Sequence, residues 1–269
     1  MALTMSSILV MLIGTVFLVQ SQSYSRQVQR SGAHDNARSA TELVAGEIRN
    51  TMAGGIVAAF ADSLTVRTPM ALAAVCGTRG SNRAYVQMEG GEAGLDTDEV
   101  AGFGVLDPTT GSWSFYNVEW RRIDNGTRDA ADECDALGAD TVGAYDEFLR
   151  LRRLEQYHGV LPPEGSILMI FRETTFLLRQ SGMESGSLAL YRGAWGQSPV
   201  EYATGMDSTA AFSFRRTGTS SYAAPVTGLQ LAAIDAVRFD AATRKRAQTG
   251  TLDDVRFGWS VNIPLRNVR

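Results

Sequence analysis

The chain has 269 residues, a length that allows one large or two small folded units. Hydrophobic residues make up 44% and charged residues 20%, which is typical of a globular protein and argues against wholesale disorder. The formal net charge of −4 argues against a dedicated nucleic-acid-binding protein, because neutralising phosphates requires a basic face.

The chain carries no charged side chain before Arg26, and the run from Ile8 to Val19 is almost wholly apolar. Together with the residues before it, this run approaches the roughly 20 residues that a membrane-spanning helix needs. A cleaved secretory signal would show a basic start, a shorter apolar centre and a small-residue cleavage site, none of which is clear here. Gly14 and the polar run Gln20–Ser23 allow two interpretations: local unwinding, or a close-packing site at Gly14 in a membrane helix.

A helical pattern continues beyond the apolar run without a proline. One face of it is apolar, because small and aliphatic residues recur at spacings of three and four. These residues are Ala33, Ala37, Ala40, Val44 and Ile48. With a stop at Gly54 and Gly55, we expect one helix from near residue 2 to about residue 53, about 75–80 Å long. Its first half requires lipid or a bundle of similar helices, and its second half requires a globular partner, most economically the rest of the chain.

After Gly55 the pattern changes to short extended segments separated by Gly, Asn, Asp and Pro. An amphipathic helix is predicted near Tyr145–Gln156, and Ile56–Ala61 either extends or follows the first helix. The predicted strands are Leu64–Arg67, Ala84–Met88, Gly102–Leu106, Trp113–Trp120, Ser166–Arg172, Thr175–Gln180, Leu188–Arg192, Ala210–Arg216, Ala232–Phe239 and Val255–Ile263. The fold class is therefore α+β. Residues 1–54 are expected to form a membrane and assembly helix, packed on an antiparallel β-rich globular domain of residues 55–269.

Two runs carry a family resemblance, ALTMSSILVMLIGTVFLVQSQSYSRQ and HDNARSATELVAGEIRN. They are similar to the N-terminus of type IV pilins and pseudopilins, and most similar to the longer minor pilins. The matching residues are Tyr24, Asn36, Arg38, Leu43, Ala45, Glu47, Ile48 and Arg49. The resemblance implies a subunit that polymerises through its N-terminal helix. It implies assembly contacts at Met1, Met5, Ile8, Leu12, Gly14 and Phe17, and packing of Ala37, Ala40, Val44 and Ile48 on the chain's own domain.

The sequence departs from this family at two points. Family precursors have a short basic leader that ends in Gly and is removed, and the mature chain usually begins Phe-Thr-Leu-Ile-Glu. No leader is present here, so Met1 is either the mature first residue or a translation start. Met5 stands where the family has a carboxylate that pairs with the amine of a neighbouring subunit. Met5 indicates a tip position, another means of setting the register, or a lineage that does without the pair.

Later segments extend the resemblance more loosely, and the middle of the chain, from about residue 90 to 165, has no match. The matching segments are Ser187–Gly193, Pro199–Met206, Ala211–Arg215, Leu231–Phe239 and Val261–Asn267. The first three resemble the order found in the longer minor pilins, in which a short strand ending Leu-Tyr-Arg precedes a region that leads into a Phe-rich strand. The last two are similar to the final two strands of that family.

Two groups of residues are candidate structural sites. Cys76 and Cys134 are a candidate disulfide if the domain lies outside the cytoplasm, and two buried free thiols are the alternative. Asp96, Asp98 and Glu99 are candidate calcium ligands, because some pseudopilins hold calcium in a loop, and a solvated acidic loop is the alternative.

No motif for catalysis or nucleotide binding is recognisable. The histidines are His34 and His158, and neither is accompanied by a G-x-S-x-G nucleophile motif. No phosphate-binding or dinucleotide-binding glycine motif follows a predicted strand. We therefore expect no enzyme activity, no cofactor and no nucleic-acid partner.

Three functions remain open. The chain is a structural subunit of a type IV pilus-like filament, a low-copy minor or tip subunit acting in adhesion or secretion, or a monomeric membrane-anchored envelope domain. The first two place it in an extracellular filament at the cell surface, bound to copies of itself or to other pilins, after an inner-membrane precursor state.

Overall fold

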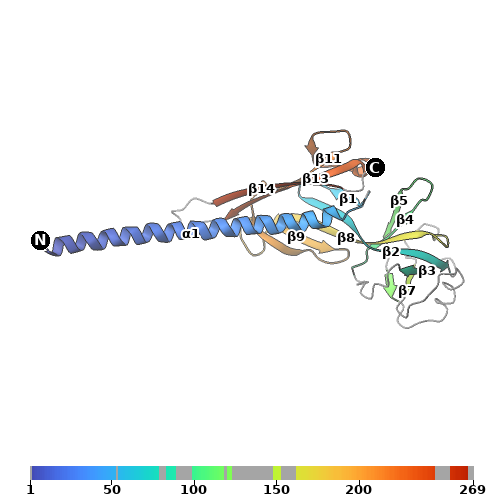
Figure 1. Ribbon diagram of the computed structural model, residues 1–269, viewed down its shortest axis with the longest axis horizontal. Helices are drawn as coiled ribbons and strands as arrows, with labels where there is room; N and C mark the ends of the chain where they lie inside the picture. The colour runs from blue at the N-terminus through green and yellow to red at the C-terminus, as the bar shows by residue number, and fades with distance from the viewer. Residues whose placement is uncertain are drawn as a thin grey trace.

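The computed structural model describes residues 2–52, 54–78, 83–88, 99–117, 120–122, 148–152, 162–245 and 255–265. One long helix, α1 (Ala2–Arg49), enters a β-rich body with its C-terminal half and projects from it with its N-terminal half (Figure 1). Its 48 residues span about 72 Å. Side chains along α1 are described from Val10 onward. The fold class is α+β, with α1 packed on antiparallel strands.

Among the described residues, 14 strands form one antiparallel sheet. Their bounds are β1 Ile56–Ala59, β2 Ser63–Thr78, β3 Arg83–Met88, β4 Gly102–Leu106, β5 Trp113–Asn117, β6 Trp120–Arg122, β7 Phe148–Arg152, β8 Ile167–Gln180, β9 Leu188–Ala194, β10 Val200–Met206, β11 Ala211–Arg216, β12 Tyr222–Ala223, β13 Ile234–Lys245 and β14 Val255–Pro264. A short 3-10 helix, η1 (Gly228–Ala233), precedes β13.

Strands β2 and β8 are the long pair that organises the sheet. They pair from Ser63 with Leu177 to Ala74 with Ile167. Near the end that contains Ser63 and Leu177, β1 pairs with β2 and β9 pairs with β8. Near the other end, β3 pairs with β2 and β4 pairs with β8. The sheet therefore has one part beside α1 and a distal part beyond the end of the helix (Figure 1).

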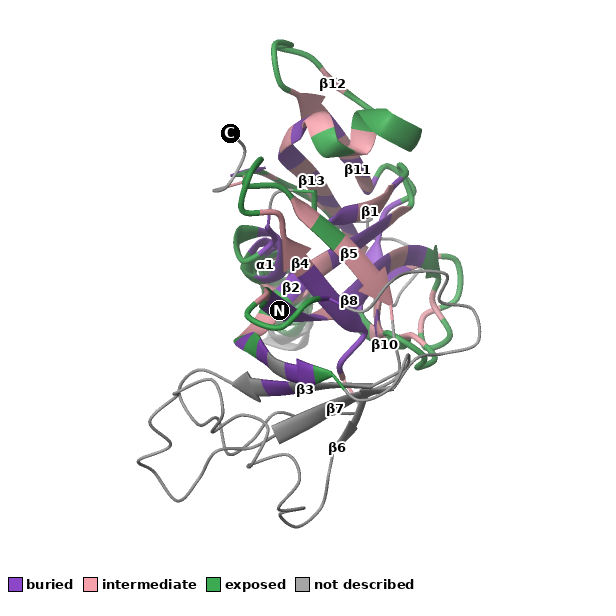
Figure 2. Ribbon diagram, turned by 90° about the vertical axis from the view of Figure 1, so that its right-hand side faces the viewer, coloured by how far each residue is buried: buried purple, intermediate pink, exposed green. Residues whose placement is uncertain are grey.

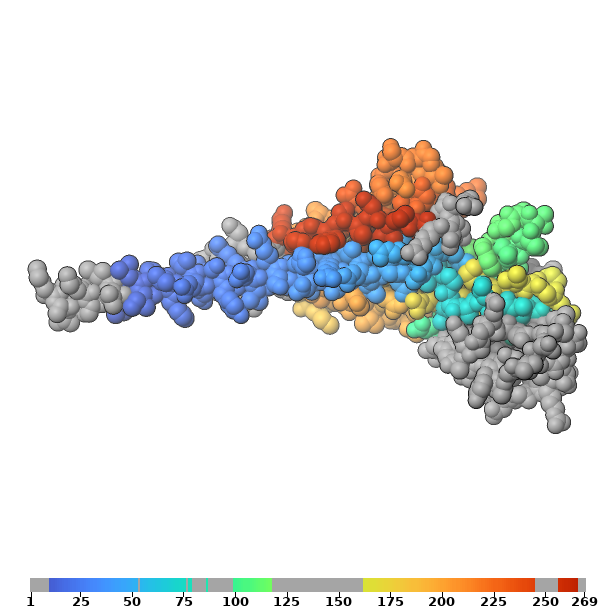
Figure 3. All heavy atoms as spheres, viewed as in Figure 1, coloured from blue at the N-terminus to red at the C-terminus, as the bar shows by residue number. Residues whose placement is uncertain are grey.

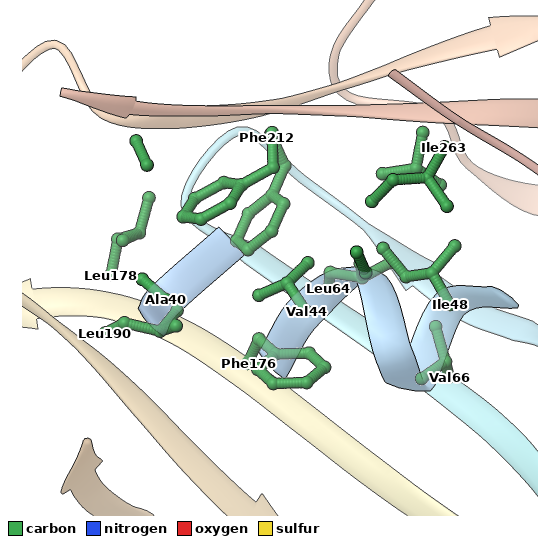
Figure 4. Close-up of a cluster of buried hydrophobic side chains, with 14 of the residues drawn as sticks. Ala40, Val44, Ile48, Leu64, Val66, Phe176, Leu178, Leu190, Phe212 and Ile263 are labelled. Atoms are coloured by element: carbon green, nitrogen blue, oxygen red, sulfur yellow. The ribbon is translucent and has the colours of Figure 1, made fainter. Parts of the chain in front are cut away.

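The main core surrounds the C-terminal half of α1. Strands β13 and β14 lie on one side of the helix and β8 and β9 on the other (Figure 1). Phe212 reaches the helix from one side and Phe176 from the other, and both are buried (Figure 4). The two sides are joined between β10 and β13 by one residue pair, Met206 with Thr243. Buried positions gather in the strands at the centre of the body, and exposed positions in its loops (Figure 2).

The distal part has its own smaller core. It consists of buried side chains from the far ends of β2 and β8 and from the strands beside them. These residues are Ala73, Val75, Val86, Val100, Phe103, Leu168 and Ile170. The segments without a family resemblance therefore include strands that build the end of the molecule farthest from the N-terminus.

The prediction of a helix near Tyr145–Gln156 is wrong over the centre of that segment, where the structure has strand β7. β7 pairs with β3 on one edge and β6 on the other. From Leu149 to Arg152 the segment alternates apolar and charged residues, so it fits a two-residue period as well as a helical one. Pairing on both edges selects the strand. The remaining residues of the predicted helix lie outside the described residues.

The first helix also ends earlier than predicted, at Arg49 and not near residue 53. Gly54 has a φ of 71°, a conformation that glycine adopts without strain and that turns the chain back on itself. Ile56–Ala59 is therefore strand β1, paired with β2, and does not extend the helix. Towards the N-terminus, α1 continues unbroken through Gly14 and Gln20–Ser23, so the local unwinding considered for that stretch is not present.

A buried ion pair lies in the β2–β8 ladder. Arg67 Nε is 3.5 Å from Glu173 Oε2, and the guanidinium group of Arg67 lies about 5 Å from the rings of Phe115 and Phe171. Burial raises the pKa of Glu173 although Arg67 opposes the shift, and burial lowers the pKa of Arg67. For both residues, the loss of hydration outweighs the attraction between the charges.

This pair predicts a pH dependence of stability. Because the pKa of Glu173 is higher in the folded state than in the unfolded state, its contribution to stability is present at low pH and is lost as pH rises through the folded-state pKa. We expect the unfolding free energy of the wild type to fall relative to that of Glu173→Gln over the pH range above the ordinary glutamate pKa of about 4.3, by at most about 1.4 kcal/mol per pH unit. Denaturant titrations of both proteins across this range measure the difference, and a difference independent of pH would contradict the prediction.

Candidate functional site

The projecting half of α1 is exposed on every side. All residues from Val10 to Val28 are exposed, and the helix stands clear of the body (Figure 3). Its large apolar side chains between Val10 and Val19 are 55% to 74% exposed. They are Val10, Met11, Leu12, Ile13, Val16, Phe17, Leu18 and Val19. A helix that is apolar all round is normally buried, so we expect this segment to be stable only when lipid or other apolar side chains surround it.

The apolar segment Val10–Val19 has a shape that suits close packing. A Cβ added at Gly14 would have no neighbour within 4 Å, and small residues let another helix approach the backbone. Next to it, Leu12, Ile13, Val16, Phe17 and Gln20 line an apolar hollow. Side chains of a second helix have room to enter here.

The predicted assembly residues are placed as follows. Leu12 and Phe17 are 59% and 70% exposed on the apolar segment, and Gly14 lies between them. Met5 and Ile8 are in the helix, but their side chains, together with Met1, lie outside the described residues.

The other half of α1 is fixed to the body through its small residues. Ala37, Ala40, Val44 and Ile48 are fully buried. Backbone-directed hydrogen bonds add to this packing: the Thr243 hydroxyl donates to the Ala33 carbonyl over 3.0 Å. The Asn36 side-chain amide donates to the Thr204 carbonyl, on β10, over 3.1 Å. Since α1 is continuous, these contacts hold the projecting segment rigidly to the domain.

A charged cluster anchors the C-terminal end of α1. Glu47 is 7% exposed, and its carboxylate accepts hydrogen bonds from Arg172 (2.9 Å and 3.1 Å), Arg192 (3.0 Å) and Thr68 (3.1 Å). Arg172 also lies 3.5 Å from Glu99. We call Glu47, Thr68, Arg172 and Arg192 the Glu47 cluster. From the sequence, Glu47 is recognised only as a residue that matches the family resemblance. It stands seven residues after Ala40, at the spacing of the apolar stripe, which is a signal that it is buried.

Most of the remaining candidate residues lie outside the described residues, so the predicted calcium site and disulfide stay predictions. Asp96, Asp98 and Cys134 lie outside the described residues, as does the side chain of Cys76. Glu99 is engaged with Arg172. The described residues contain no group of three or more side chains that could hold a metal ion. His34 packs edge-on against Phe257 and Trp259, with ring centroids 4.9 Å and 5.5 Å away, and His158 lies outside the described residues.

Within the residues that the structure describes, no helix is both long enough and apolar enough to cross a membrane. Comparison of the chain with family models, with curated proteins and with solved structures found no match.

Proposed function

We propose that the chain is a structural subunit of a type IV pilus-like extracellular filament and that it polymerises through the projecting half of α1. The observation that carries this proposal is the apolar segment Val10–Val19, exposed on every side and joined by a continuous helix to a β-rich domain. The resemblance of residues 2–50 to type IV pilins and pseudopilins supports the same assignment.

The energetics favour a bundle of parallel helices over a closed dimer. Burying the exposed apolar side chains of one copy would contribute on the order of 10 kcal/mol before the entropy of association is subtracted. A single neighbour covers only one face of the helix, so the other faces stay exposed until further copies join. Contacts of this kind between different faces build an open helical filament when the rotation from one copy to the next does not close into a ring. The β-rich domains then form its outer surface.

Before assembly, the same segment needs another apolar environment. Lipid supplies one, so the proposal includes a precursor held in the inner membrane by α1 with the β-rich domain outside the cytoplasm. Incorporation into the filament replaces contacts with lipid by contacts with neighbouring helices.

A low-copy minor or tip subunit is the second candidate. The distal part of the sheet favours it, because this part includes β3, β4 and β8 and lies at the end of the molecule farthest from the assembly helix. Mass spectrometry of purified filaments separates the two candidates. A main component of the filament supports the structural subunit, and a trace component supports the minor or tip subunit.

Assembly of the full chain tests the proposal. After purification in detergent and removal of the detergent, we expect filaments by negative-stain microscopy and sedimentation. Val16→Asp with Phe17→Asp places two charges in the apolar core, and we expect it to raise the critical concentration more than about 100-fold. Leu229→Asp is the matched control, because Leu229 is apolar and 98% exposed but lies on the domain.

Circular dichroism checks that each variant keeps the wild-type fold. Filaments formed by the double aspartate variant at the wild-type concentration would contradict polymerisation through α1. A wild-type chain that remains monomeric after detergent removal would contradict the filament itself.

A further inference from the structure

Two arginines stand between the apolar segment and the β-rich body. Arg26 and Arg30 are both exposed and are four residues apart, so they share one face of α1. Neither takes part in an ion pair within the described residues, whereas Arg38 further along the helix pairs with Glu42 at 2.7 Å. The first acidic residue of the chain is Asp35. The helix therefore has a basic collar, Arg26 and Arg30, at the edge of its apolar part.

The position of the collar matches the headgroup layer of a bilayer. Arg26 lies seven residues beyond Val19, about 10 Å along the axis, and Arg30 about 16 Å beyond it. With the apolar segment in the hydrocarbon, Arg26 reaches the headgroup phosphates, and Arg30 stays within about one Debye length of the surface. Tyr24 lies between the two regions and is 70% exposed, and tyrosine rings favour this interface.

We propose that Arg26 binds the phosphate groups of anionic phospholipids, that Arg30 adds attraction to the same charged surface, and that the two together hold the unassembled chain at an anionic membrane surface. The proposal rests on the membrane-anchored precursor state of the proposed function. A guanidinium group donates two parallel hydrogen bonds to a phosphate, and an anionic headgroup has no cation of its own to compete with the arginine. Each arginine near an anionic surface contributes about fivefold in affinity.

Arg49 provides a matched control on the same helix. It is exposed like Arg26 and Arg30, but lies 30 residues beyond Val19, about 45 Å along the axis. This distance is several Debye lengths, so Arg49 cannot sense the charge of the membrane surface.

Spin-label measurements on the full chain test the proposal. The chain is reconstituted into phosphatidylcholine bilayers with trace spin-labelled phosphatidylglycerol or spin-labelled phosphatidylcholine, and the relative association constant of the two lipids is determined. We expect the wild type and Arg49→Gln to prefer phosphatidylglycerol by about fivefold or more, and Arg26→Gln with Arg30→Gln to bind both lipids about equally.

An equal association of both lipids with the wild type, or a preference that survives in the double glutamine variant, overturns the lipid assignment. Equal association together with loss of filament assembly in that variant also overturns it, because the arginines then contact a neighbouring copy. Vesicle flotation separates this inference from the proposed function. A chain that fails to float with vesicles contradicts the membrane-anchored state, whereas a chain that floats without lipid preference contradicts only the role of the collar.

Discussion

Replacing Glu47 with alanine is expected to lower the free energy of unfolding by about 3–5 kcal/mol. The wild-type carboxylate is almost fully buried and accepts hydrogen bonds from Arg172, Arg192 and Thr68. Without it, two guanidinium groups remain in a partly buried site with only Glu99 near one of them. The loss comes mainly from these uncompensated charges and less from the missing hydrogen bonds themselves.

Glu42→Ala is the matched control for this prediction. Glu42 lies on the same helix, its side chain is 64% exposed, and it forms one pair with Arg38 at a spacing of four residues. Such a pair contributes about 0.5 kcal/mol or less. Denaturant titration of the full chain in detergent compares the two variants. Equal losses for Glu47→Ala and Glu42→Ala would show that the Glu47 cluster does not hold α1 to the sheet.

The long helix could be predicted because its pattern is local. Residues three or four positions apart lie on the same face of a helix, so a short stretch of sequence shows which face is apolar. The stripe from Ala33 to Ile48 is buried throughout. The ends of the strands were harder to predict from the sequence. The predicted strand Leu64–Arg67 covers only the first part of β2. Pro69 lies beyond it, and proline removes a ladder hydrogen bond. The structure accommodates Pro69 at an irregularity in the β2–β8 register, so β2 continues to Thr78.

Strand β10 was missed for a related reason. It has two register shifts against β9, and Gly205 has a φ of 71°. Shifts of this kind interrupt the alternation of buried and exposed side chains on which strand prediction depends. The strand is held instead by its neighbours, including the hydrogen bond from Asn36 on α1. Contacts with residues far away in the sequence therefore determine it.

The Glu47 cluster also depends on contacts with residues far away in the sequence, which local patterns do not predict. A glutamate in an amphipathic helix usually faces solvent, and nothing in residues 33–49 alone supplies a partner for it. Its partners Arg172 and Arg192 lie 125 and 145 residues away in the sequence. Only the sheet brings β8 and β9 to the end of α1. The apolar segment, in contrast, depends on no distant residue, and for that reason it could be recognised from the sequence.

Replacing Phe239 with alanine is expected to lower the free energy of unfolding by about 3–5 kcal/mol. Phe239 is fully buried on β13 and stacks on Phe212, with ring centroids 4.7 Å apart and an interplanar angle of 20°. Truncation leaves a cavity beside α1 that neighbouring rings fill only in part. Because β13 pairs with both β11 and β14, the loss weakens the whole side of the sheet that covers the helix.

Phe60→Ala separates this cavity from a general effect of removing a phenyl ring. Phe60 is 42% exposed, so its truncation removes less buried surface and is expected to lower the unfolding free energy by about 1 kcal/mol. Hydrogen exchange of the α1 amides locates the effect: faster exchange at Ala33–Ile48 in Phe239→Ala only is expected if β13 clamps the helix. Similar losses in both variants, or protection of α1 unchanged by Phe239→Ala, would mean that the opposite side of the sheet alone holds the helix.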